Sequence, residues 1–278
     1  MLDSIPSRTA LGAALYRAAH QLVDRPLVFE DPLALRILGP TRALQVELER
    51  RATHAASAMR AFIAARSRYA EDAFAAAHAR GVRQYVVLGA GLDTFAYRCT
   101  LERVQVYEVD RAEMQQWKRE WLARLGIAVP QSAASAPVDF ERETIGEALS
   151  RTSFDLAQAA FFAWLGVAAY LTAEAVRKTL QGIAKSMAPG SEIVFDFATP
   201  LDLDSPVSAA REAFSARVAA AGEPLRSAFA PEDLCAQTRE LGFSRAQVVD
   251  TAVLNERYFL GRKDGLQLRG GHLMHTRS

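Results

Sequence analysis

The hydrophobic and polar positions follow two different periods along the chain. From about residue 9 to 80 the pattern is helical, in "ALGAALYRAAHQLV" and in "ATHAASAMRAFIAARSRYAEDAFAAAHARG", and Gly81 closes the second of these segments. The turn-like stretch "DRPLVFEDPLA" separates the two. The pattern therefore predicts an N-terminal region made of helices.

After Gly81 short apolar runs alternate with helical segments. The runs "QYVVLG", "VQVYEVD", "APVDF", "AAFFAWLG" and "SEIVFDFA" predict buried strands, whereas residues 111–125, 172–187 and 231–241 predict helices. This alternation is typical of a parallel sheet covered by helices on both faces. The small-residue stretch "PQSAASAP" predicts a loop at 130–137.

Two further segments complete the expected architecture. The stretch "LDLDSPVSAAREAFSARVAAAGEPLRSAF" interrupts the alternation after the fifth strand, and its amphipathic middle predicts an inserted helix over the carboxyl ends of the strands. The chain then finishes with "RAQVVDTAVLNERYF" and "GLQLRGGHLMHTRS", which predict two closing strands paired as a hairpin. We expect one domain over residues 1–278: a helical cap (1–80), a core (81–278) and a lid inserted at about 200–229.

Composition narrows the class of partner. The 278 residues include 33 basic and 32 acidic side chains, so the net charge of +1 argues against nucleic acid or an anionic membrane as the main partner. Cys99 and Cys235 belong to no CxxC pair, which fits a reducing cytoplasm and indicates neither a disulfide framework nor a zinc site. No signal-like N-terminus and no apolar run of about eighteen residues is found, so we expect neither export nor membrane spanning.

The turn "LGAGLDT" follows the first predicted strand. In an open parallel sheet the ligand crevice lies at the carboxyl ends of the strands, and Gly89 and Gly91 would let the backbone turn tightly and approach a ligand there. Asp110 ends the next strand, where a carboxylate can accept hydrogen bonds from both ribose hydroxyls. The alternative is a tight connection without a ligand, with Asp110 capping the helix that follows.

The neighbours of the turn distinguish two adenosine cofactors. A dinucleotide fingerprint has a third glycine where this chain has Thr94. Asp93, beside the turn, would repel a pyrophosphate but suits the ammonium group of a methionine moiety. The residues therefore favour S-adenosylmethionine over a dinucleotide such as NAD.

Several blocks of the sequence together resemble one family. "SRTALGAALYRA", "FEDPLA", "ARSRYAEDAFAAAHARGVRQYVVLGAGLDTFAYR", "VYEVD", "FAWLGVAAYLT" and "LNERYFLGRKDGL" resemble the leucine carboxyl methyltransferase family, and most of all its bacterial branch of S-adenosylmethionine-dependent methyltransferases. The resemblance implies a class I methyltransferase fold of the Rossmann-like α/β type. Its features would be a seven-stranded sheet with an antiparallel last strand, extra N-terminal helices and a lid.

The resemblance also assigns cofactor-binding residues. Arg66 matches the arginine that pairs with the methionine carboxylate, and Arg68 is its alternative; a bidentate guanidinium suits this role. The family pattern likewise places Gly89 and Gly91 at the cofactor turn and Asp110 on the ribose. Asp139 and Phe140 match the pair that holds adenine, with the carboxylate on the exocyclic amine and a backbone N–H on a ring nitrogen.

One position departs from the family pattern. Protein-methylating members carry a glutamate just before the residue matching Gly166, whereas this chain has Leu165, preceded by Trp164. The change leaves open how the cofactor's ammonium is held, and it argues against carrying over the phosphatase substrate of those members. Trp164 packs either on a ligand or in the core.

The acceptor is the remaining question. A carboxylate acceptor is ionised at neutral pH and needs no base, which agrees with a sequence without an evident Ser-His-Asp, Cys-His or metal constellation; His272 and His275 lack a third ligand nearby. A phenol, with a pKa of about 10, would gain from a base such as His20. No catalytic residue is assigned, and Tyr170, Tyr258 and Arg262 are the candidate substrate-binding residues.

The expected activity is thus O-methylation of a small molecule, most simply a carboxylate of a polyketide-like or aromatic natural product. The alternatives are a phenol or hydroxyl acceptor, an NAD-dependent oxidoreductase, and a module that binds the cofactor without turnover. The Tyr-x-x-x-Lys pair of many oxidoreductases is missing. Oligomeric state is left open by the sequence.

Overall fold

The sheet and its order follow the expected class. The computed structural model describes residues 7–48, 57–140, 142–201 and 208–278. A seven-stranded sheet has the order β3-β2-β1-β4-β5-β7-β6. β1 to β5 are parallel, and β7 runs antiparallel to both of its neighbours. The strands are β1 (Gln84–Leu88), β2 (Gln105–Asp110), β3 (Ala133–Pro137), β4 (Ala160–Trp164), β5 (Glu192–Phe197), β6 (Arg245–Val249) and β7 (His272–Arg277).

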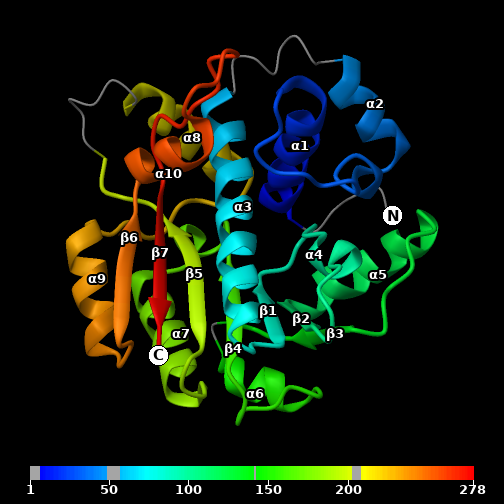
Figure 1. Ribbon diagram of the computed structural model, residues 1–278. Coiled ribbons are helices and arrows are strands. Elements are labelled where there is room, and N and C mark those ends of the chain that lie inside the picture. The colour runs from blue at the N-terminus through cyan, green and yellow to red at the C-terminus, as the bar shows by residue number, and fades with distance from the viewer. Residues whose placement is uncertain (1–6, 49–56, 141, 202–207) are drawn as a thin grey trace.

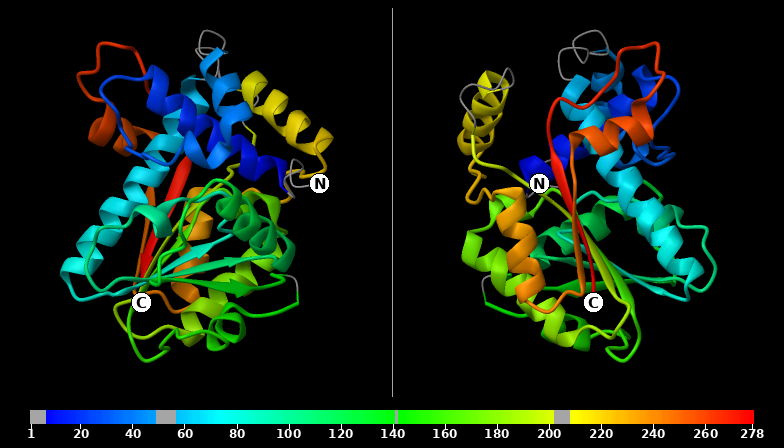
Figure 2. Two further views of the ribbon diagram at one scale, coloured as in Figure 1. Left: turned by 90° about the vertical axis from the view of Figure 1, so that its right-hand side faces the viewer. Right: turned by 60° about the vertical axis from the view of Figure 1, so that its left-hand side comes forward.

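Helices cover both faces of the sheet. The α-helices are α1 (Arg8–Val23), α2 (Pro40–Leu48), α3 (Ser57–Ala79), α4 (Phe95–Arg98), α5 (Ala112–Arg124), α6 (Ile145–Ser150), α7 (Ala173–Ser186), α8 (Ser208–Ala220), α9 (Pro231–Glu240) and α10 (Thr251–Phe259). Short 3₁₀ helices are η1 (Arg36–Leu38) and η3 (Ala168–Tyr170). α3 lies across one face in Figure 1, and α7 and α9 lie on the opposite face in Figure 2.

The alternation of side chains along β1 explains these two layers. Tyr85 and Val87 pack in the cluster with α3, whereas Val86 and Leu88 pack in the cluster with α6, α7 and α9. A strand whose residues are all buried needs apolar cover on both faces, because successive side chains point to opposite sides. A third cluster joins α1 and η1 to α5 through Trp117 and Trp121.

Most expected elements are present at the expected places. α5, α7 and α9 confirm the three helices predicted at 111–125, 172–187 and 231–241. α1 and α3 occupy the two helical N-terminal segments, and α8 lies inside the inserted segment. Residues 52–56 of the second predicted helix and residues 202–207 of the inserted segment lie outside the described residues. α1, α2, α8 and α10 gather at the end of the sheet where the parallel strands finish (Figures 1 and 2).

Two expectations were wrong. The third strand is not "APVDF" but Ala133–Pro137, within the predicted loop: as an edge strand it pairs through its backbone with β2 alone, so small side chains suffice. The segment "RAQVVDTAVLNERYF" is not one strand, because Asp250 accepts a hydrogen bond from Val253 N at 2.9 Å and caps α10. β6 and β7 do pair antiparallel, but α10 and a loop connect them instead of a hairpin turn.

Among the described helices, none is both long and apolar enough to cross a bilayer.

Candidate functional site

A cleft of about 940 Å³ opens at the carboxyl ends of the parallel strands. Its walls come from the loops after β1, β2, β3 and β4, from the cleft-facing side of α3, from the start of α1 and from the loop after α8. All six predicted cofactor residues line it: Arg66, Gly89, Gly91, Asp110, Asp139 and Phe140. The structure therefore brings together residues that are up to 74 positions apart in the sequence.

The turn after β1 has no room for side chains at its two glycines. Gly89 has φ +69°, and a Cβ there would lie 2.3 Å from Cγ2 of Val167. Gly91 has φ +44°, and a Cβ there would lie 3.1 Å from that of Ala10. The turn is thus enclosed by the loop after β4 and by α1, which leaves only its backbone facing the cleft.

Asp110 is held against this turn and not against the next helix. Its Oδ2 accepts a hydrogen bond from Gly91 N at 2.7 Å, and its Oδ1 accepts one from Arg111 N at 2.8 Å. The N-cap position of α5 is Arg111, which makes no side-chain capping bond. Burial raises the pKa of Asp110, although the two backbone hydrogen bonds oppose the shift. This partly desolvated carboxylate suits a ligand hydroxyl better than a helix cap.

The predicted adenine pair follows β3. Pro137 is the last residue of the strand, and the backbone continues with Val138 N donating to Asp110 O at 2.9 Å. Asp139 is half exposed and forms an ion pair with Arg142 at 3.4 Å, and Phe140 packs at the edge of the second core cluster. Asp139 and Phe140 line the cleft, as Asp110 does, and they follow the strand that pairs with the strand of Asp110.

Arg66 is held by an ion pair with Asp196 and keeps one buried donor without a hydrogen-bond partner among the described residues. Its Nη1 donates to Asp196 Oδ2 at 2.8 Å, and the other oxygen of Asp196 accepts from Gly166 N. A Cβ at Gly166 would lie 2.7 Å from Nη2 of Arg66, so only glycine lets the guanidinium lie there. Nε of Arg66 is buried and has no hydrogen-bond partner among the described residues. A buried donor without a partner is costly, and three other side chains of the described residues, Gln115, Trp164 and Thr276, share this feature with Arg66.

Arg68 faces away from this cleft. It forms an ion pair with Asp72 at 2.7 Å and donates to Val28 O, and it is not among the residues that line the cavity. The geometry therefore separates the two arginines that the sequence left interchangeable and favours Arg66.

The three candidate substrate residues lie in different places. Tyr170 lines the cleft, and burial is the main cause that raises its pKa to about 12, so the hydroxyl stays protonated at neutral pH. Tyr258 donates to Asp72 Oδ2 at 2.9 Å, and Arg262 pairs with Asp264 and donates to Pro26 O at 2.7 Å. Neither Tyr258 nor Arg262 lines the cleft, and both are occupied in contacts that join the C-terminal region to the N-terminal region.

Of the neighbouring residues Trp164 and Leu165, only Leu165 lines the cleft. Trp164 is fully buried, tilts against Phe195 at 5.7 Å between ring centroids and does not line the cavity, so it is a core residue. Leu165 does line the cavity and presents an aliphatic side chain there.

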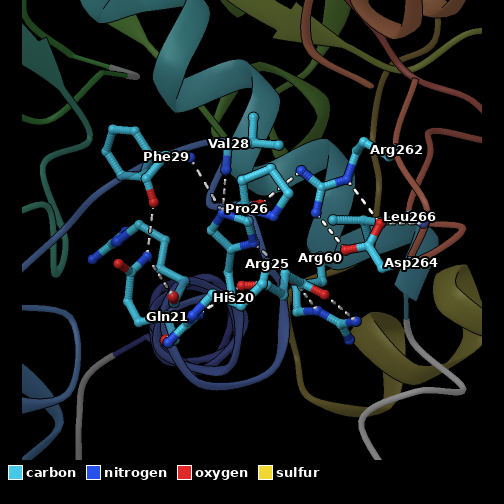
Figure 3. A network of polar contacts seen from close by, with 12 residues as sticks. His20, Gln21, Arg25, Pro26, Val28, Phe29, Arg60, Arg262, Asp264 and Leu266 are labelled. Carbon is cyan, nitrogen blue, oxygen red and sulfur yellow. Dashed lines mark hydrogen bonds and ion pairs between the residues drawn. The ribbon is translucent and has the colours of Figure 1, made fainter. Parts of the chain in front are cut away.

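His20 is a structural residue and not a free base. Val28 N and Phe29 N both donate to its Nε2, at 3.1 and 3.2 Å, so the proton is on Nδ1, which donates to Asp24 Oδ2 at 2.7 Å. Figure 3 shows His20, Val28, Phe29 and Arg60 in one network of polar contacts. Because both nitrogens are engaged and the side chain is fully buried, His20 cannot take a proton from an acceptor in the cleft.

His272 and His275 do not form a metal site. They are three apart on β7; His272 packs on Phe197, and Nε2 of His275 pairs with Glu192 at 3.0 Å. Within the described ranges, no group of three or more His, Cys, Asp or Glu side chains is placed to hold a metal ion.

Sequence reasoning missed a buried network that holds the turn after β1. Thr94 Oγ1 and Arg17 Nε both donate to Asp31 Oδ2, at 2.7 and 3.2 Å, and Arg17 Nη2 donates to Leu92 O at 2.6 Å. Thr94, where a dinucleotide fingerprint has glycine, thus joins the turn to the loop before α2. The signal was present in the quoted block "FEDPLA", whose aspartate is Asp31.

Comparison with known proteins places the chain among methyltransferases. A model described as leucine carboxyl methyltransferase matches residues 10–184. The Bacillus subtilis protein named "Putative S-adenosyl-L-methionine-dependent methyltransferase YktD" is 29% identical, and the alignment covers 94% of this chain and 93% of that protein. A Mycolicibacterium smegmatis protein with the same kind of name is 33% identical, over 70% of this chain and 64% of that protein.

Among solved structures, that of a DUF574 family protein from Streptomyces avermitilis is similar with a TM-score of 0.56. The match covers 96% of this chain and 97% of that chain, at 14% sequence identity. At this identity the similarity concerns the fold alone.

Proposed function

We propose that this chain, which belongs to the leucine carboxyl methyltransferase family, transfers the methyl group of S-adenosylmethionine to a carboxylate of a small molecule. Family membership confirms the resemblance inferred from the sequence, and the related methyltransferases confirm the expected cofactor. The acceptor, which we take to be a polyketide-like or aromatic natural product, and the oxygen-directed chemistry are the proposed part.

The residues of the cleft fit the cofactor. Asp110 would accept hydrogen bonds from the ribose, and Asp139 with the backbone of Phe140 would hold adenine. Arg66 would bind the methionine carboxylate through the side of its guanidinium that Asp196 does not occupy, and its buried Nε without a partner supports this role. Gly89 and Gly91 keep side chains out of the path between these groups.

The residues that line the rest of the cleft favour a carboxylate as the methyl acceptor. S-adenosylmethionine supplies an electrophilic methyl group on a sulfonium; a carboxylate oxygen bonds to the methyl carbon while the carbon–sulfur bond breaks and its electrons stay on sulfur. No proton moves in this step. Of the described histidines, none lines the cleft, and Tyr170 is a donor because its pKa is raised to about 12. A hydrogen-bond donor without a histidine base suits an acceptor that is already ionised.

The size of the cleft leaves room for an acceptor. A cavity of about 940 Å³ is near the upper end of the range for single ligand sites. Tyr170 and the loop at 222–226 line the part closed by α1, and we place the acceptor there. We further propose that residues 1–278 act as one methyltransferase domain in the cytoplasm, with residues 1–80 as its cap and the inserted segment (200–229) as a lid.

The test compares acids with phenols. The full chain is incubated with S-adenosylmethionine labelled in its methyl group and with aromatic acids, each paired with the phenol of the same skeleton. We expect label in the acids, at a rate that changes little from about pH 6 to 9 because the acceptor is already ionised. Label in the phenols alone, at a rate that rises with pH, would show that the acceptor is a hydroxyl. Binding without label in any acceptor would favour a module without turnover.

A further inference from the structure

Five arginines line the cleft, and four of them lie on walls other than the one that we assign to the acceptor. Arg66 comes from α3 and is paired with Asp196, and Arg17 comes from α1 and is paired with Asp31. The two on the side of the predicted adenine and ribose contacts are Arg111, which follows β2, and Arg151, which donates to Pro137 O at the end of β3. Among the described residues that line the cleft, Arg226 is the one cation from the loop after α8.

The loop that carries Arg226 is bonded through its backbone to η3. Arg226 N donates to Ala169 O at 2.8 Å. The buried Ser227 adds a second contact, because its Oγ donates to Ala168 O at 3.1 Å. Ala169 directly precedes Tyr170, which lines the same cleft. These contacts place Arg226 beside the segment that presents the Tyr170 hydroxyl.

The segment after β4 that includes η3 is itself held next to Arg66. Gly166 N donates to one oxygen of Asp196, and the other oxygen of Asp196 accepts from Arg66 Nη1 at 2.8 Å. The same segment therefore contacts Arg66 through Gly166 and the loop of Arg226 through η3. One guanidinium is positioned on the side of the cofactor, and a second is positioned on the side of the acceptor.

The charges of the loop after α8 favour an anion at Arg226. Glu223 lies on the same loop, but its Oε2 accepts from Thr9 N at 2.7 Å in the first turn of α1, where the helix dipole stabilises its charge. Arg226 is exposed to the cleft and also interacts with the protein. Its guanidinium has five N–H donors, so it can hold a protein partner and a ligand together.

We propose that Arg226 binds the carboxylate of the acceptor and selects acids over neutral molecules, in place of Arg262, which lies outside the cleft. One carboxylate oxygen would accept from Arg226 and the Tyr170 hydroxyl, which leaves the other oxygen for the methyl group. The assignment rests on the proposed function, because it takes a carboxylate as the methyl acceptor.

The reaction removes the charge that Arg226 recognises. A carboxylate oxygen bonds to the methyl carbon while the carbon–sulfur bond breaks with its electrons on sulfur, so a carboxylate and a sulfonium become a neutral ester and a thioether. The attraction of the guanidinium is therefore strongest for the acid and weaker in the transition state and in the ester. Arg226 should lower the KM for the acid without raising kcat, and it should let the ester leave.

The test compares acids with their own methyl esters. Benzoate and 2-naphthoate, each beside its methyl ester, are titrated by calorimetry into the full chain saturated with S-adenosylhomocysteine. Transfer of label from S-adenosylmethionine to the same acids gives KM and kcat. We expect the wild-type protein to bind each acid about tenfold more tightly than its ester.

Three variants locate this preference. R226Q removes the charge, and R226K keeps the charge but loses the planar fork. R217Q is the matched control, because Arg217 lies on α8 in the same inserted segment, is exposed and does not line the cleft. For R226Q we expect about tenfold weaker binding of the acids and about tenfold higher KM, with ester affinity and kcat within twofold of wild type. R226K should lie between R226Q and wild type, and R217Q should stay within twofold of wild type.

The affinity for S-adenosylhomocysteine shows whether the cleft is intact, and it should be the same in all variants. If R226Q binds the acids as wild type does, or weakens acid and ester equally, the assignment of Arg226 is wrong, while label in the acids would leave the proposed function standing. A parallel loss of affinity for S-adenosylhomocysteine would make Arg226 a structural residue and would also overturn the assignment. If the wild-type protein neither binds nor labels the acids, the proposed function fails, and the assignment fails with it.

Discussion

The two halves of the cleft are built in different ways. In the half that we assign to the cofactor, Gly89, Gly91, Asp110, Asp139 and Phe140 each end a parallel strand or lie within three residues of its end, so the sheet itself places them close together. In the half that we assign to the acceptor, the first turn of α1 meets the loop after α8, and Glu223 Oε2 accepts a hydrogen bond from Thr9 N at 2.7 Å across 214 residues. Topology fixes the first half, whereas side-chain contacts between distant segments close the second.

The matched family model covers one half of the cleft fully and the other half in part. It covers residues 10–184, which include every predicted cofactor residue, whereas the loop at 222–226 lies beyond it. One methyl donor can serve many acceptors, so we expect the acceptor half to vary more among relatives than the cofactor half. The predictions below ask whether the two halves can be changed independently.

The largest expected change is a loss of folding stability when the buried network of Arg60, Asp24 and His20 is broken. Nε and Nη2 of Arg60 donate to the two oxygens of Asp24, at 2.7 and 2.9 Å, and both side chains are at most 5% exposed. Arg60→Leu leaves Asp24 charged and buried with His20 as its remaining partner in Figure 3. We expect a loss of about 3–5 kcal/mol in the free energy of unfolding, measured by urea denaturation.

Arg68→Leu is the control for this prediction. It removes an arginine from the same helix, but its pair with Asp72 is 47% exposed on the arginine side, so a loss below about 1 kcal/mol is expected. Equal losses from the two variants would mean that the Asp24 network does not stabilise the N-terminal region.

Asp110→Ala should weaken cofactor binding and leave acceptor binding unchanged. The variant removes the acceptor of Gly91 N and the expected acceptor of the ribose hydroxyls. We expect the binding of S-adenosylhomocysteine to weaken by about 1–3 kcal/mol in calorimetry, while the KM for the acceptor stays the same at saturating cofactor. An unchanged dissociation constant in the folded variant would remove Asp110 from the cofactor site.

The strands that sequence analysis placed correctly share one property. β1, β2, β4 and β5 are central, and their Val, Phe, Tyr and Ile residues are needed to fill both faces of the sheet. β3 was misplaced because an edge strand of "AASAP" carries no such pattern. α10 was missed because its start depends on one capping side chain, Asp250, within a segment rich in β-branched residues.

The residues of the candidate site also fall into those that could be placed from the sequence and those that could not. Residues attached to strand ends could be predicted to meet, because parallel strands bring their carboxyl ends to one edge. Tyr258 and Arg262 could not be placed from the sequence, since their partners Asp72 and Pro26 are more than 180 residues away. For Arg66 and Arg68, which are two positions apart on α3, only the packed helix shows which one faces the cleft.

Tyr170→Phe tests the acceptor half directly. Since the pKa of Tyr170 is raised to about 12, we expect its hydroxyl to act as a donor throughout the neutral range, and its loss should remove one hydrogen bond to the acceptor. The expected result is a KM for the acceptor about fivefold higher, equivalent to about 1 kcal/mol, with the affinity for S-adenosylhomocysteine unchanged. Steady-state kinetics with an acid that accepts label would measure it.

Tyr258→Phe is the matched control for Tyr170→Phe, because it also removes a hydroxyl and its partner is Asp72, outside the cleft. It should leave the KM for the acceptor unchanged. If Tyr258→Phe raised this KM as much as Tyr170→Phe did, the effect would come from the folded framework and not from contact with the acceptor.

The smallest effect should come from the contact that closes the acceptor half. Glu223 accepts from Thr9 N in the first turn of α1, where an anion is favoured by the helix dipole. Glu223→Gln keeps an acceptor but loses the charge, so closure should weaken by about 0.3–1 kcal/mol. Limited proteolysis should then cleave within residues 200–229 about twofold to fivefold faster, with the affinity for S-adenosylhomocysteine unchanged. A matching loss of cofactor affinity would instead mean that the two halves of the cleft are coupled through α1, whose Ala10 packs against Gly91.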